Sequence, residues 1–205
     1  MTCDMDIQNI YNSIAELSRE IVRECTARSV KISTAESCTG GMISGAVTSI
    51  SGSSAVIELG VCSYSNRIKH EILHVPAEVL KRFTEYSVEC AAEMAKGVME
   101  LSGADYGVST TGVAGPTGGS AEHPVGLDHL EGVGQLILIS GVVAAQRQGQ
   151  VIAQAHIGQL LGIAGVQGGG ELIAALEHLE DQVQVVAAVG FVQIFHILQH
   201  GGGDA

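Results

Sequence analysis

The amino-acid sequence predicts an α/β fold, a three-layer α/β/α sandwich with a largely parallel sheet. Short apolar stretches typical of strands alternate with longer stretches of helical period through residues 1–126, and such alternation favours a parallel sheet covered by helices. Polar residues and glycines follow three of the expected strands. This places Ser37, Tyr64 and Thr111 at carboxyl ends of strands, where α/β proteins bind their ligands.

The first predicted elements are a helix, a strand and a second helix. Apolar residues recur every three or four positions over residues 7–22, which indicates one buried helical face. A short apolar strand is expected over residues 30–35, and residues 39–49 are expected to form the next helix. Ser37 therefore lies on the turn between this strand and this helix.

The later elements continue the alternation of strand and helix. Residues 57–63 predict an apolar strand, and Asn66 is expected to cap a short helix that continues to His74. The remaining predictions are a helix over 85–101, a strand over 104–110, a glycine-rich loop over 111–119, a strand within 134–145 and a helix over 170–180.

An abrupt change of composition divides the chain. Nine of the ten Lys and Arg residues lie at or before Lys96, and from Gly118 onward there is no Lys, Asn, Thr, Tyr, Cys or Met. We therefore expect a core over residues 1–126 and a low-complexity tail over 127–205 that completes the same domain or is appended to it. A shifted reading frame, natural divergence and a non-natural tail would each produce this composition.

Charge and composition exclude several functional classes. The formal net charge is −12 and the isoelectric point is near 4.9, so a nucleic acid or an anionic membrane would be repelled. The acidic start of the chain is unlike a secretory leader, and no apolar stretch is long enough to span a bilayer, so a cytoplasmic protein is expected. The expected partner is a small molecule.

The cysteines indicate reduced thiols. They are odd in number and have no C-x-x-C spacing, which favours neither a disulfide framework nor a zinc site; they are Cys3, Cys25, Cys38, Cys62 and Cys90. No metal and no cofactor are expected. His196 and His200 share one helical face at ligand spacing, but without an adjacent carboxylate they are interpreted as surface residues.

The stretch "STAESCTGG", residues 33–41, is the first candidate for chemistry. A serine on a strand-to-helix turn has an exposed hydroxyl, and the N–H groups of the following helical turn can face a developing negative charge. A serine before a helix is, however, more often a simple cap. Cys38 is an alternative nucleophile, although no histidine motif nearby supports that interpretation.

Five separated motifs occur in a fixed order and carry a resemblance. They are "AESCTGG" at 35–41, "GSSA" at 52–55, "YSN" at 64–66 with Lys69 three residues later, "TGVAGPTGG" at 111–119 and "HPVG" at 123–126. Together they closely resemble the nicotinamide-nucleotide amidase family, which is also the C-terminal domain of the competence/damage-inducible protein CinA. The match covers about three-fifths of the chain. Few residues precede it, so the stand-alone amidase form is expected rather than the two-domain form.

The resemblance implies hydrolysis of the carboxamide of nicotinamide mononucleotide to nicotinate mononucleotide and ammonia. It implies that Ser37 is the nucleophile and that Lys69, with Tyr64 close by, activates it. A serine attacking an amide needs a neighbouring base, and a lysine can serve if burial lowers its pKa. The amides of residues 38–41 would form the oxyanion hole.

The glycine-rich loop of residues 111–119 can cradle a phosphate or a ribose through its backbone N–H groups, or it can be only a flexible surface loop. It matches neither a Walker A sequence nor a G-x-G-x-x-G fingerprint. The full set of expected substrate-binding residues is Glu36, Cys38, Thr39, Gly40, Gly41, Asn66, Thr111, Gly112 and Gly115.

The resemblance stops near Gly126. The family continues into a strand and an arginine-bearing segment that contacts substrate, whereas this chain has "LDHLE" and only Arg147 as a later arginine. Two alternatives to the amidase therefore stay open: a weak or inactive member that binds a nucleotide or another subunit, and a different serine-dependent amidohydrolase. The resemblance also implies a homo-oligomer.

Overall fold

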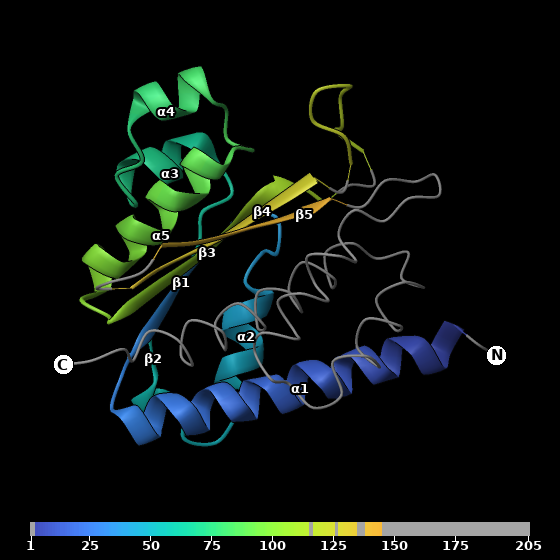
Figure 1. Ribbon diagram of the computed structural model, residues 1–205, viewed down its shortest axis with the longest axis vertical. Helices are drawn as coiled ribbons and strands as arrows, with labels where there is room; N and C mark the ends of the chain where they lie inside the picture. Colours follow the sequence, from blue (N-terminus) through green and yellow to red (C-terminus); the bar gives the residue numbers. More distant parts are fainter. Residues whose placement is uncertain (1–2, 115–116, 126, 135–137, 145–205) are drawn as a thin grey trace.

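A computed structural model describes residues 3–114, 117–125, 127–134 and 138–144, with side chains from residue 11 to 114 and from 117 to 125. Figure 1 shows the arrangement of these residues. The helix predicted over 170–180, the paired histidines His196 and His200, and Arg147 lie outside the described residues.

One mixed sheet runs through the described residues in the strand order β2-β1-β3-β4-β5. Its first three strands are parallel, and β4 and β5 are antiparallel to their neighbours. Only three residues separate β4 from β5, too few for a parallel crossover. The strands are β1 (Ile32–Glu36), β2 (Ile57–Cys62), β3 (Tyr106–Val113), β4 (Leu127–Gly134) and β5 (Leu138–Ala144).

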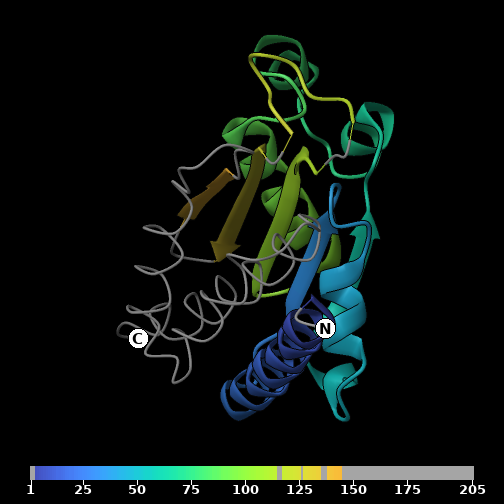
Figure 2. The same cartoon turned by 90° about the vertical axis from the view of Figure 1, so that its right-hand side faces the viewer.

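Helices cover both faces of the sheet, which confirms the predicted α/β/α sandwich. The helix α5 packs on β1, β3 and β4, while α2 packs on β1 and β2 and is covered by α1. Figures 1 and 2 show these two layers on opposite sides of the strands. The helices are α1 (Cys3–Arg28), α2 (Met42–Thr48), α3 (Asn66–Glu71), α4 (Ala77–Arg82) and α5 (Val88–Ser102), with a short 3₁₀ helix at Ser53–Ala55.

The element boundaries differ from the sequence predictions at several points. The helix predicted over 7–22 is the longer α1, and α4 was not predicted. The cap of α3 is Ser65, not Asn66: the Ser65 hydroxyl accepts a hydrogen bond from the Ile68 N–H at 3.3 Å. The strand β3 continues to Val113, so Thr111 lies in the strand and not in the glycine-rich loop.

Two glycines allow α5 to lie close to its neighbours. A Cβ atom at Gly97 would stand 1.9 Å from the carbonyl oxygen of Leu73, and one at Gly107 would stand 2.1 Å from that of Ala95. Leu73 is buried with Met94 and Val98 in the core beneath α5. The segment that follows α3 is therefore held directly against α5, and this contact fixes the position of α3.

None of the helices in the part of the chain described by the structure is both long enough and apolar enough to cross a membrane.

Candidate active site

The carboxyl ends of the three parallel strands are joined by backbone hydrogen bonds. The N–H of Ser37, just after β1, donates to the carbonyl oxygen of Thr110 in β3 at 3.0 Å. On the other side, the N–H of Ser63, just after β2, donates to the carbonyl oxygen of Glu36 at 2.7 Å. The turn that carries Ser37 is thereby anchored between both neighbouring strands.

Glu36, the last residue of β1, is completely buried and holds the start of α2. Its carboxylate accepts hydrogen bonds from the N–H groups of Gly41, Ile43 and Ser44 at 3.1, 3.0 and 2.8 Å. The hydroxyls of Thr39 and Ser44 donate to it at 2.7 and 2.5 Å. A helix start leaves N–H groups without partners, and here a buried carboxylate satisfies them.

The two glycines after this turn serve its backbone geometry. Gly40 and Gly41 have φ angles of 60° and 101°, in the region that favours glycine, while a Cβ atom at either would meet nothing within 4 Å. The Gly40 N–H donates to the Ser37 carbonyl oxygen at 3.2 Å, and that of Gly41 donates to Glu36. The expectation that these two amides face an oxyanion is therefore corrected: both already have partners within the turn.

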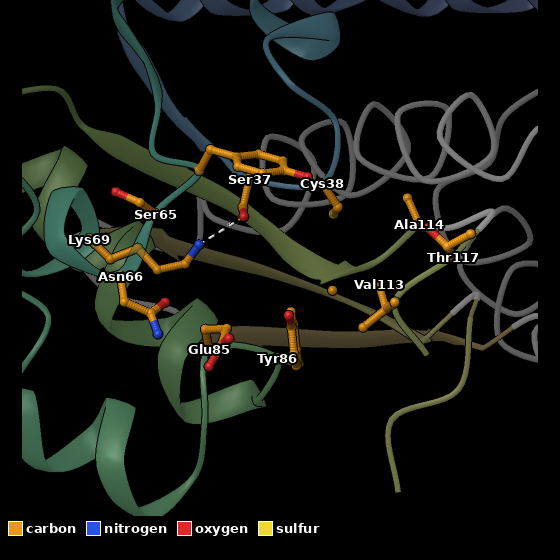
Figure 3. Close-up of a pocket in the computed structure, with 13 residues that line it drawn as sticks. Ser37, Cys38, Ser65, Asn66, Lys69, Glu85, Tyr86, Val113, Ala114 and Thr117 are labelled. Carbon is orange, nitrogen blue, oxygen red and sulfur yellow. Dashed lines mark hydrogen bonds between the residues drawn. The ribbon is translucent and has the colours of Figure 1, made fainter. Parts of the chain in front are cut away.

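Ser37 and Lys69 meet inside the molecule. The Lys69 Nζ donates to the Ser37 Oγ at 2.8 Å and to the Ser63 carbonyl oxygen at 3.0 Å. Lys69 is 1 % exposed and is the one buried residue of α3, whose other side chains lie toward solvent or at the surface. Figure 3 shows the two side chains pointing toward each other. The structure thus brings together a hydroxyl and an amine that lie 32 residues apart in sequence.

Burial lowers the pKa of Lys69 below its ordinary value of 10.5. The ionised forms of the nearby cysteines and of Glu85 act in the opposite direction but do not outweigh the loss of hydration. No ion pair to Lys69 occurs among the described residues. A lysine of this kind reaches its neutral, basic form at a lower pH than an exposed lysine does.

A cleft of about 690 Å³ opens over this pair. It is within the volume range, about 300–1,000 Å³, of pockets that hold small molecules. Six residues expected from the sequence line it: Ser37, Cys38, Tyr64, Asn66, Lys69 and Gly112. Tyr64 is 77 % exposed, so its ring stands at the opening rather than in the core.

Other expected site residues do not line the cleft. The Thr39 hydroxyl contacts that of Thr110 at 2.8 Å, in addition to its bond with Glu36. The Thr111 hydroxyl is buried and donates to the Glu85 carbonyl oxygen at 2.6 Å. With Glu36, Gly40 and Gly41, these residues shape the turn and the strand ends and are not among the residues that line the cleft. Gly115 lies outside the described residues.

Several residues of the cleft were not among the sequence predictions. Glu85 and Tyr86 come from the segment between α4 and α5, and only the fold brings that segment over Ser37. Ser63 does not line the cleft, but its backbone carbonyl oxygen accepts a hydrogen bond from the Lys69 Nζ, a contact that no sequence pattern identifies. The remaining lining residues are Ser65, Val113, Ala114, Thr117 and Gly118.

Within the described residues, no group of three or more His, Cys, Asp or Glu side chains is arranged to hold a metal ion.

The fold and the site together define an α/β protein with a buried serine–lysine pair, the combination of nucleophile and neighbouring base that covalent hydrolases use. The chain belongs to the CinA C-terminal domain family, whose model matches residues 14–155. The family predicted from the sequence motifs is thus confirmed.

Curated relatives include both short and long proteins. A protein of Enterobacter agglomerans named nicotinamide-nucleotide amidohydrolase PncC is 49 % identical over 111 residues, which are 54 % of this chain and 68 % of that protein. A CinA-like protein of Synechococcus sp. (strain RCC307) is 46 % identical over 113 residues, 55 % of this chain and 27 % of that protein. The chain therefore spans about a quarter of the longer relatives that it matches.

Solved structures show the same fold. The competence/damage inducible protein CihA from Agrobacterium tumefaciens has a TM-score of 0.69 at 33 % identity, covering 92 % of this chain and 96 % of that one. The competence damage-inducible protein A from Klebsiella pneumoniae has a TM-score of 0.71 at 24 % identity, covering 91 % and 98 %. The second likeness concerns the fold alone.

Proposed function

We propose that the protein hydrolyses the carboxamide of nicotinamide mononucleotide to nicotinate mononucleotide and ammonia. The observation that carries the proposal is the 2.8 Å contact between the Lys69 Nζ and the Ser37 Oγ inside a cleft of small-molecule size. The name of the Enterobacter agglomerans relative supports the choice of reaction and substrate. A cytoplasmic location and a homo-oligomer stay predictions of the sequence.

In the first half of the reaction, the neutral amine of Lys69 takes the proton of the Ser37 hydroxyl while the Ser37 Oγ attacks the carboxamide carbon. The tetrahedral intermediate collapses, the C–N bond breaks, and the departing nitrogen takes a proton from the Lys69 ammonium and leaves as ammonia. The buried amine suits both steps because burial lowers its pKa, so the neutral form that accepts a proton is present at a lower pH than for an exposed lysine.

In the second half, water attacks the ester that joins the acyl group to Ser37. The Lys69 amine takes a proton from this water, and the same proton then returns to the Ser37 Oγ as the ester bond breaks. Nicotinate mononucleotide leaves and the free serine is restored. Splitting amide hydrolysis into two acyl transfers replaces one difficult step with two easier ones.

The residues that line the cleft bear on how this substrate would bind. A pyridine nucleotide carries a positive ring and a negative phosphate, and the described lining of the cleft holds one carboxylate, Glu85, and one basic side chain, Lys69. Tyr64 at the opening offers an aromatic face to the ring.

The direct test is ammonia release from nicotinamide mononucleotide by the purified chain and by Ser37→Ala. We expect release by the wild type and loss of at least about a thousandfold in the variant, because the nucleophile is gone. Ser51→Ala, which removes an exposed serine hydroxyl, is the matched control and keeps full activity. A folded wild type that releases no ammonia contradicts the proposal and favours a member that only binds a nucleotide.

A further inference from the structure

The wall of the cleft that carries Glu85 and Tyr86 has no part in the proton transfers described above. Both residues line the same cleft as Ser37 and Lys69. Figure 3 shows their side chains next to each other, along the wall away from Ser37. The backbone of Glu85 is fixed because its carbonyl oxygen accepts the Thr111 hydroxyl at 2.6 Å. The wall is therefore attached to β3, the central strand of the site.

Glu85 supplies the negative charge of this cleft. It is the one carboxylate among the described lining residues, and Lys69 is the one amine. The described residues give Glu85 no ion pair. Its charge acts on the reaction centre, since it raises the pKa of Lys69 against the larger effect of burial. A cation bound between Glu85 and Lys69 would therefore face a carboxylate that has no ion pair with any described residue.

Tyr86 places an aromatic ring beside that carboxylate. Burial raises the pKa of Tyr86, and the charge of Glu85 and a hydrogen bond between the two side chains act in the same direction. The Tyr86 ring also lies against that of His123, with centroids 5.6 Å apart and planes inclined by 56°. A carboxylate next to a fixed aromatic face is an arrangement that binds organic cations.

We infer that Glu85 and Tyr86 form a subsite for the positively charged ring of the substrate, so that the cleft selects pyridinium nucleotides over nucleotides whose ring is neutral. The inference rests on the proposed function, because the carboxamide that Ser37 attacks is attached to that ring. The ring charge is thus recognised at one wall while the carboxamide faces the opposite one.

The experiment measures binding rather than turnover, by calorimetry on the Ser37→Ala chain. The two ligands are nicotinamide mononucleotide and its reduced form, which has the same phosphate, ribose and carboxamide but a neutral ring. We expect the cationic form to bind about tenfold more tightly, a size typical of a partly exposed carboxylate combined with a cation–π contact. Adding Glu85→Gln should bring the ratio of the two affinities to within about twofold.

Two further variants separate the subsite from general electrostatics. Glu89→Gln removes an exposed carboxylate four residues away that does not line the cleft, and it should leave the ratio unchanged. Tyr86→Leu, which keeps Glu85 but removes the ring, should lower the ratio to about threefold. Equal affinity of the two ligands for the parent chain overturns the inference, and so does a ratio that survives Glu85→Gln.

The outcomes are distinguishable from those for the proposed function. Ammonia release by the wild type together with equal binding of the two ligands leaves the amidase intact and removes the subsite. Charge-selective binding without ammonia release from the wild type supports the subsite and overturns the amidase. If Glu85 acted only by changing the pKa of Lys69, Glu85→Gln would change the affinities for both ligands by the same factor. The ratio of the two affinities would then equal that of the Ser37→Ala chain.

Discussion

Glu36 and Lys69 are both charged residues buried at the carboxyl edge of the sheet, but their surroundings differ. Glu36 is 0 % exposed and has hydrogen-bond donors from Thr39, Gly41, Ile43 and Ser44 around both carboxylate oxygens. Lys69 is 1 % exposed and has two acceptors, one of which is the Ser37 hydroxyl. The difference shows two outcomes of burying an ionisable group. The Glu36 carboxylate has hydrogen-bond donors around both oxygens and stabilises a turn, whereas the Lys69 amine has few partners and a lowered pKa, which suits a reactive group.

The largest expected effect is the loss of the base. Lys69→Met keeps a long apolar side chain but removes the amine, so ammonia release should fall by about 10³-fold, as for other general bases. Lys96→Met, at an exposed position of α5, is the matched control and should keep the wild-type rate. Activity of Lys69→Met within tenfold of the wild type would show that Lys69 is only a packing residue.

The same variant has an opposite effect on stability. Because the pKa of folded Lys69 lies below 10.5, the unfolded chain binds more protons between the two values. The buried amine therefore costs stability fully below its folded pKa, and this cost disappears as the pH rises toward 10.5. Urea unfolding of both chains should show Lys69→Met as the more stable, with a difference that shrinks as the pH rises through that window.

Glu36→Gln tests the other side of the comparison. The amide group of glutamine would place its own N–H₂ against donors that now point at a carboxylate, which should lower the free energy of unfolding by about 2–3 kcal/mol. Glu58→Gln, on the exposed face of β2, is the control and should change it by less than about 1 kcal/mol. Equal effects of the two substitutions in urea unfolding would remove the structural role assigned to Glu36.

Gly97→Ala affects the position of Lys69 indirectly. The added Cβ would stand 1.9 Å from the Leu73 carbonyl oxygen, so the segment after α3 must shift. We expect a loss of about 2 kcal/mol in the free energy of unfolding, the usual cost of overpacking. Ammonia release should fall as well, because α3 carries Lys69. Gly45→Ala, which meets nothing within 4 Å, is the control; a Gly97→Ala chain as stable and active as this control contradicts the packing argument.

The smallest expected effect concerns a neutral cap. The Ser87 hydroxyl accepts the Cys90 N–H at 3.1 Å at the start of α5, just as Glu36 caps α2, but without a charge. Ser87→Ala should therefore cost about 1 kcal/mol in thermal or urea unfolding, less than Glu36→Gln. A cost larger than that of Glu36→Gln would reverse the order that the hydrogen bonds imply.

The sequence predicted the alternation of strands and helices, the family, and the six cleft residues that include Ser37 and Lys69. The fold and the family are confirmed because period and motif are local properties, whereas the catalytic and binding roles of the six residues stay predictions. It assigned Glu36, Gly40 and Gly41 to the substrate, since a motif does not show which members face a ligand and which hold the turn. Glu85 and Tyr86 were not predicted, because no local pattern shows that the segment before α5 lies over the turn after β1.

The antiparallel β4 was not expected from "LDHLE" either, and its pairing is visible only through its register with β3. The division of the chain at residue 126 stays a prediction.

The measurement that tests the central claim most directly is the pH dependence of kcat/KM for ammonia release from nicotinamide mononucleotide. Since burial lowers the pKa of Lys69, the fraction of neutral amine rises with pH through that lowered value. We predict that kcat/KM rises with pH and levels off below pH 10.5, the ordinary pKa of lysine. A rise that continues to that ordinary value, or a profile unchanged in Lys69→Met, would contradict the assignment of the buried lysine as the base.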